Sequence, residues 1–104
     1  MARAANISWQ TRKVLLALDA SAPGWRYGYD LLKQIGLSSG TLYPLLARLN
    51  DQNLVEAEWH ASPHAGRPAR HAYRLTSAGC QAAVAAREAE ATETANASLE
   101  GATA

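Results

Sequence analysis

The chain has 104 residues and a net charge of +1, which suits one small domain. Its single cysteine excludes an internal disulfide, and no apolar run is long enough for a membrane span or a signal peptide, so we expect a cytoplasmic protein without a membrane partner. The charge is divided unevenly: nine Lys/Arg stand against five Asp/Glu up to Arg74 (+4), and one stands against four from Leu75 onward (−3), which predicts different surroundings for the two halves.

Two helices are predicted before the first well-defined turn. Apolar residues recur at helical spacing over residues 7–20, with Ser8 as the N-cap, while Trp9 lies off the apolar stripe, at a core edge or a subunit contact. A shorter amphipathic stretch covers residues 27–35, and Gly36 ends it as a C-terminal glycine would. Because the turn to the next helix is so short, the two helices must cross steeply, as in a helix-turn-helix.

The third predicted helix, residues 39–51, is the element around which the chain is organised. Its leucines at positions 42, 45, 46 and 49 follow the spacing i, i+3, i+4 and i+7 and form one core-seeking face. The opposite face offers small hydroxyls and a guanidinium, which are groups that reach base edges in the major groove of DNA. An ordinary amphipathic helix with a solvated outer face is the alternative. The residues of this outer face that we expect to contact DNA are Ser39, Thr41, Tyr43, Pro44 and Arg48.

A β-hairpin with a basic loop follows the third helix. Residues 54–61 alternate between apolar and polar, with Trp59 on the half-buried side, and residues 71–76 alternate again. The segment between them, residues 62–70, contains two prolines and a glycine and reads as a stiff loop. A guanidinium on such a loop suits a phosphate backbone or a narrow minor groove. The basic residues predicted at this wing tip are Arg67 and Arg70, with His64 and His71 beside them.

The last predicted helix spans residues 78–97, is capped by Ser77, and is rich in alanine and glutamate. Its small side chains allow a second copy to approach closely, and Val84 with the alanines around it supplies a seam. We therefore predict a homodimer held by this helix together with the first one. Residues 98–104 are small and polar, and we expect them to be disordered.

In chain order these elements predict a fold that is mainly α with a small β-hairpin. Residues 1–76 form a winged helix-turn-helix DNA-binding domain, and residues 77–97 form a single C-terminal dimerisation helix. The outer face of the third helix and the basic wing together favour double-stranded DNA as the partner. A dimer reads a palindromic operator whose half-sites lie about 34 Å apart.

Four stretches carry a pattern that is more specific than the fold: residues 27–32, 37–49, 54–59 and 67–79. Their most distinctive runs are Gly-Thr-Leu-Tyr-Pro-Leu-Leu and Tyr-Arg-Leu-Thr-x-x-Gly, and the pattern resembles the PadR family of transcriptional regulators. The resemblance implies a winged-helix dimer that binds palindromic promoter DNA, usually as a repressor, and that in many members is released by a small aromatic effector. It also implies DNA contacts from the third-helix residues named above and from the two wing arginines. A constitutive regulator without an effector stays open, because the chain is short after Thr76.

Other functions are weighed against the same residues. The spacing of His60, His64 and His71 matches no metal-ligand pattern, and no phosphate loop or catalytic triad appears, so we predict no metal, no cofactor and no enzymatic activity. Cys80 beside a helix start is best explained as structural. Trp9 is the residue on which a planar effector would stack at the dimer seam, against the simpler interpretation of core or interface packing. A winged-helix protein-interaction module without DNA binding is the rival function.

Overall fold

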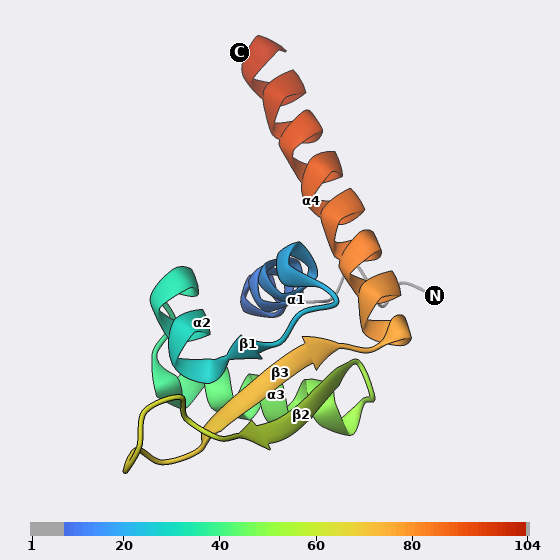
Figure 1. The fold of residues 1–104 in the computed structure, drawn as a ribbon. Helices are drawn as coiled ribbons and strands as arrows, with labels where there is room; N and C mark the ends of the chain where they lie inside the picture. Colours follow the sequence, from blue (N-terminus) through green and yellow to red (C-terminus); the bar gives the residue numbers. More distant parts are fainter. Residues whose placement is uncertain (1–7, 104) are drawn as a thin grey trace.

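The structure, a computed structural model, describes the backbone of residues 8–103 and the side chains of residues 8–92. The predicted order of helices and hairpin is confirmed, with one additional short strand (Figure 1). Among the described helices, none combines the length and the apolar character needed to cross a bilayer. The elements are α1 (Trp9–Ser21), β1 (Arg26–Tyr27), α2 (Gly28–Ile35), α3 (Ser39–Asp51), β2 (Val55–His60), β3 (Arg70–Leu75) and α4 (Ser77–Thr103).

The core is built where α1, α2 and α3 present leucines to one another and to the sheet. All four leucines predicted for the inner face of α3 are buried, and Leu15 and Leu31 from the two preceding helices are fully inaccessible. Burying each such side chain contributes about 1.5–3 kcal/mol, which makes this cluster the main source of stability. Leu16 of α1 is half-buried and packs against this cluster.

The local signals at the helix ends also hold. The side chain of Ser8 accepts a hydrogen bond from the backbone N–H of Thr11, so the predicted N-cap of α1 is confirmed. Gly36 ends α2 with φ +83°, a left-handed conformation that glycine adopts without steric cost. Ser38 is the N-cap residue of α3, and its hydroxyl donates to the Thr41 hydroxyl at 3.1 Å rather than capping a backbone N–H.

The sheet has three antiparallel strands in the order β1-β3-β2. In the hairpin, Val55 pairs with Leu75 and Ala57 pairs with Tyr73, which places these four side chains on one face. That face packs on α3, which runs behind the sheet in Figure 1. Strand β1 was not predicted because two residues carry no periodicity, and it exists only by pairing with the otherwise free edge of β3.

Trp59 departs from its predicted burial. It lies on the same face of the hairpin as Ala57 and pairs with His71, but its position near the loop end leaves the indole 67% exposed. The ring instead stacks on the imidazole of His71, with 4.3 Å between centroids and 9° between planes. The prediction of a half-buried Trp59 is therefore wrong, and the indole forms part of an accessible aromatic surface.

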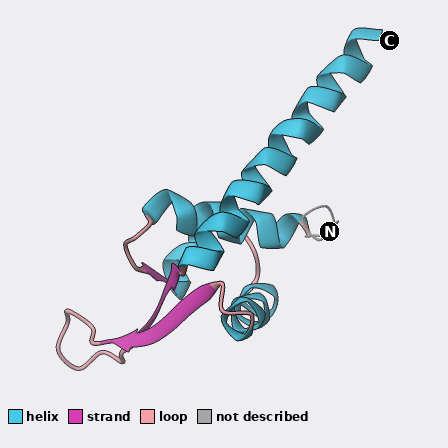
Figure 2. Ribbon diagram, turned by 90° about the vertical axis from the view of Figure 1, so that its right-hand side faces the viewer, coloured by secondary structure: helices cyan, strands magenta, loops and turns pink. Residues whose placement is uncertain are grey.

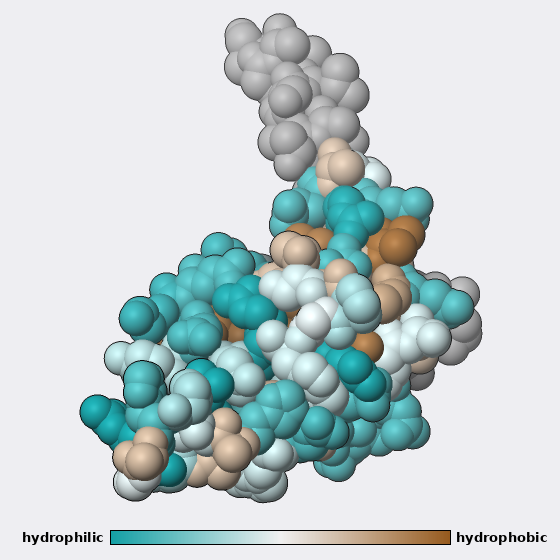
Figure 3. All heavy atoms as spheres, viewed as in Figure 1, coloured by the Kyte–Doolittle hydropathy of each residue, from teal (hydrophilic) through white to brown (hydrophobic). Residues whose placement is uncertain are grey.

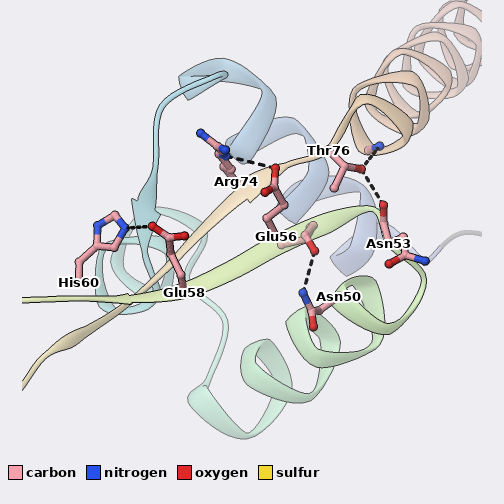
Figure 4. Close-up of polar contacts among 9 residues, drawn as sticks. Asn50, Asn53, Glu56, Glu58, His60, Arg74 and Thr76 are labelled. Carbon is pink, nitrogen blue, oxygen red and sulfur yellow. Dashed lines mark hydrogen bonds and ion pairs between the residues drawn. The ribbon is translucent and has the colours of Figure 1, made fainter.

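Helix α4 begins one residue away from the expected cap. The hydroxyl of Thr76, not Ser77, accepts the hydrogen bond from the backbone N–H of Gly79, at 3.0 Å, and donates to the carbonyl of Asn53, at 2.7 Å (Figure 4). Thr76 thus ties the start of α4 to the turn before β2. The helix continues to Thr103, so its predicted end at residue 97 is too early.

Helix α4 packs against α1 near its start and then leaves the rest of the chain (Figure 1). The hairpin loop and α3 lie at the opposite end, and this holds in the view turned by 90° (Figure 2). The molecule therefore has one end formed by α3 and the wing and another formed by the projecting helix.

Candidate nucleic-acid interface

The outer face of α3 is open to solvent in the way that a DNA-reading helix requires. Ser39, Thr41, Pro44 and Arg48 are all exposed, while the leucines between them are buried. Pro44 lies inside the helix, where it offers no N–H. The exposed set combines two hydroxyls near the N-terminal end with a guanidinium further along, all projecting from a helix whose other face is anchored in the core.

Tyr43 differs from the other predicted contacts because its ring is used within the fold. It is 37% exposed, and an ideal Cβ on Gly28 would lie 2.7 Å from both its Cε1 and its hydroxyl. The ring therefore covers the first residue of α2, and a side chain at this position would force the Tyr43 ring to shift. Burial, with a smaller effect from the nearby Tyr43 hydroxyl, raises the pKa of Tyr73 to about 12.

The two arginines predicted at the wing tip lie in different parts of the wing, whose loop covers residues 61–69. Arg67 is exposed in the loop, just after Gly66, whose φ of +79° turns the chain. Arg70 is instead the first residue of β3, and its guanidinium lies 3.8 Å above the ring centroid of Tyr27. Within the described residues its Nε is buried and finds no hydrogen-bond partner. Arg70 therefore belongs to the base of the wing and not to its tip.

The arginines of different elements differ in whether they have a charged partner. Arg74 donates to Glu56 at 3.2 Å on the sheet face away from α3 (Figure 4), and Arg87 of α4 pairs with Asp19 of α1. In contrast, the guanidinium groups of Arg48 and Arg67 have no hydrogen bond or ion pair with any residue that the structure describes. Within the described side chains, α3 and the wing thus each carry an exposed guanidinium without an ion pair.

The residues that form the helix-turn-helix and the wing also assign the chain to a protein family. The model of the transcriptional regulator PadR-like family matches residues 14–85, which cover the core of α1, the helix-turn-helix, the wing and the start of α4. The chain belongs to the PadR-like family. Its members are transcriptional regulators and not enzymes, in agreement with the prediction, and the suspected resemblance is confirmed.

Solved structures support the same fold for this PadR-like chain. A PadR-like transcription factor from Bacteroides fragilis is 26% identical, with a TM-score of 0.63 and coverage of 91% of this chain and 89% of that one. The circadian-clock-associated protein Pex from Anabaena is 24% identical, with a TM-score of 0.62 and coverage of 85% and 83%. A MarR mutant from E. coli, in complex with operator DNA, is 21% identical, with a TM-score of 0.62 and coverage of 81% and 56%. No curated protein sequence matches the chain.

These findings identify a DNA-binding transcriptional regulator of winged-helix fold. The aromatic residues around the wing were not recognised as a group from the sequence, because strand register brings them together: Trp59 is opposite His71, and Tyr27 reaches Arg70 only through β1. Trp9, the predicted effector contact, is the first residue of α1 and is 54% exposed, with the Lys13 ammonium 5.8 Å from its ring centroid.

Proposed function

We propose that the protein is a sequence-specific, homodimeric repressor in the cytoplasm that binds a palindromic operator. The observation that carries the proposal is the position of Arg48 on the outer face of α3 and Arg67 on the wing, at the end of the molecule away from α4. Neither guanidinium has a hydrogen bond or an ion pair among the described residues. Arg48 with Ser39 and Thr41 enters the major groove and reads bases, while Arg67 contacts the backbone or the minor groove.

The homodimer is supported by the surface at the other end. Val84 of α4 is 46% exposed and Trp9 of α1 is 54% exposed, whereas Ala83 and Ala86 of α4 turn inward and are buried. In the view of Figure 3, strongly apolar surface gathers around the base of α4, away from the wing. A second copy that covers α1 and α4 would remove this surface from water and leave both α3 faces free.

A selection of bound duplexes from a random pool tests the proposal. A homodimer enriches an inverted repeat whose half-site centres are separated by about one helical turn, roughly 10–10.5 base pairs. Enrichment of a single half-site would contradict the dimer, as would a sedimentation profile of a monomer at micromolar concentration. If no duplex is enriched, the rival function, a winged-helix protein-interaction module, is favoured.

Repression follows if the operator overlaps a promoter, since a dimer bound there excludes polymerase. Release by a small aromatic effector is proposed on the family resemblance, and stacking on Trp9 at the dimer seam is the site that the sequence suggests. Quenching of tryptophan fluorescence by a planar ligand in the native chain, and its loss in Trp9→Leu, tests that site. A quench that persists in Trp9→Leu would show that the effector binds at another site.

A further inference from the structure

The wing loop begins and ends at two residues that pair with each other. His60 is the last residue of β2, Arg70 is the first residue of β3, and the two stand opposite each other in the hairpin; this pair is the wing root. The buried pair of Val55 and Leu75 lies at the other end of the hairpin, whereas Trp59, next to the root, is 67% exposed. The apolar packing of the hairpin therefore ends before the root, and a two-stranded hairpin without further contacts is only marginally stable.

Tyr27 contacts both residues of the wing root. Its hydroxyl is hydrogen-bonded to Nδ1 of His60 at 3.2 Å, and the two rings meet edge to face with 5.7 Å between centroids. The guanidinium of Arg70 lies 3.8 Å from the centroid of the Tyr27 ring, in the geometry of a cation–π contact. His60 is held from a second direction, because its Nε2 bonds to Glu58 at 2.8 Å (Figure 4). One tyrosine thus joins the two ends of the wing loop.

The same tyrosine is connected to α3. Tyr27 is the N-cap residue of α2, and the next residue, Gly28, is covered by the ring of Tyr43 from α3. The pairing of Tyr27 with Ala72 also holds this segment against β3. A short path of contacts therefore leads from the wing root through Tyr27 and Gly28 to Tyr43. Because none of these contacts involves the loop itself, they fix where the loop begins and ends relative to α3.

We infer that Tyr27 and His60 are positioning residues for DNA binding: they hold the wing root against the start of α2, so that Arg67 on the loop reaches the duplex while α3 lies in the major groove. The inference rests on the proposed function, in which α3 and the wing bind one duplex. Tyr27 acts through Arg67 and not by touching DNA. Its loss therefore removes the wing contact and leaves the contacts of Arg48 on α3 in place.

Backbone relaxation of the free protein tests the anchoring of the wing without DNA. In the native chain the amides of His60 and Arg70 should be as ordered as the rest of the sheet, with order parameters of about 0.85. Tyr27→Leu removes both the hydroxyl and the ring, and the order parameters of these two amides should fall below about 0.6 while those of α3 stay unchanged. Unchanged order at the wing root in Tyr27→Leu would overturn the inference.

Operator affinity tests whether the position of the wing matters for DNA binding. Tyr27→Leu should weaken binding at least about tenfold and make its salt dependence shallower, although the substitution removes no charge. In the Arg67→Gln background, where the wing contact is already lost, the same substitution should weaken binding less than about twofold. In the Arg48→Gln background it should keep its full effect. Equal losses in the two backgrounds, or an unchanged salt dependence, would show that Tyr27 does not act through the wing.

Tyr27→Phe replaces Tyr27→Leu if that variant does not fold. It keeps the ring against Arg70 and loses only the bond to His60, so it should weaken operator binding about threefold, with the same pattern in the two arginine backgrounds. If the native chain binds its operator and neither Tyr27 variant changes the affinity, the inference is wrong and the proposed function stands. If the native chain binds no duplex at all, both are wrong.

Discussion

Gly79 sets how closely α4 approaches the start of the hairpin, and Gly79→Ala is the sharpest test of that packing. An ideal Cβ at this position would lie 1.9 Å from the carbonyl oxygen of Leu54 and 2.9 Å from its carbonyl carbon, where 3.0 Å is already closer than real Cβ atoms come. Both clashing atoms are backbone, so a rotamer change cannot relieve them. The same carbonyl accepts from the N–H of Thr76 at 3.0 Å, and moving α4 away strains that bond.

We expect Gly79→Ala to lower the free energy of unfolding by about 3 kcal/mol, at the upper end of overpacking effects. For a domain of this size that corresponds to a drop in Tm of roughly 12–24 °C. Gly40→Ala is the matched control, because a Cβ there meets nothing within 4 Å and alanine favours a helix, so it should stabilise by about 0.5–1 kcal/mol. Urea unfolding of the three proteins at one concentration measures both changes. A loss below about 1 kcal/mol for Gly79→Ala would refute the close approach.

Three further predictions concern single side chains. Because burial raises the pKa of Tyr73 from 10.0 to about 12, the folded state holds the phenolic proton longer than the unfolded chain, so this residue's contribution is intact below pH 10 and is lost as the pH rises towards 12. Alkaline unfolding curves of Tyr73→Phe should lack that part of the decline, and an unchanged slope would contradict the assignment. Arg48→Ala should lower discrimination at one position of each half-site by about 1–3 kcal/mol, measured by competition between operator variants; an equal loss on all sequences would make it a backbone contact. Thr76→Val removes the cap of α4 and the bond to Asn53, and should cost about 1–2 kcal/mol in urea unfolding, while Ser77→Ala should cost less than about 0.5 kcal/mol. Equal losses of stability in the two variants would contradict the assignment of Thr76 as the cap.

Apolar periodicity predicted the helical framework, because the leucines of α3 and the apolar residues of α1 repeat with the period of a helix and are buried as that period requires. The hairpin could also be predicted, since apolar and polar residues alternate in its two strands and the loop between them is rich in proline and glycine. These patterns depend only on residues close together in the sequence, so they can be recognised without knowledge of the fold.

The parts that could not be predicted depend on contacts between segments far apart in the sequence. Strand β1 needs the edge of β3, and only this pairing brings Tyr27 beneath the guanidinium of Arg70. The exposure of Trp59 depends on how far along the hairpin it lies, which alternation does not encode. Ser77 was the predicted cap of α4, and only the geometry shows that the neighbouring Thr76 hydroxyl accepts the capping bond.

The central claim is that α3 and the wing form one surface for duplex DNA, and two charge-matched double variants test it most directly. Arg48→Gln/Arg67→Gln removes two exposed guanidinium groups that have no partner among the described residues, and Arg26→Gln/Arg87→Gln removes two that bond to Gln34 and Asp19 within the fold. Affinity for the selected operator is measured over a range of salt concentrations. We expect the first variant to lose at least about 100-fold in affinity with a shallower salt dependence, and the second to stay within about threefold. Equal losses, or a larger loss in the second variant, would contradict the account.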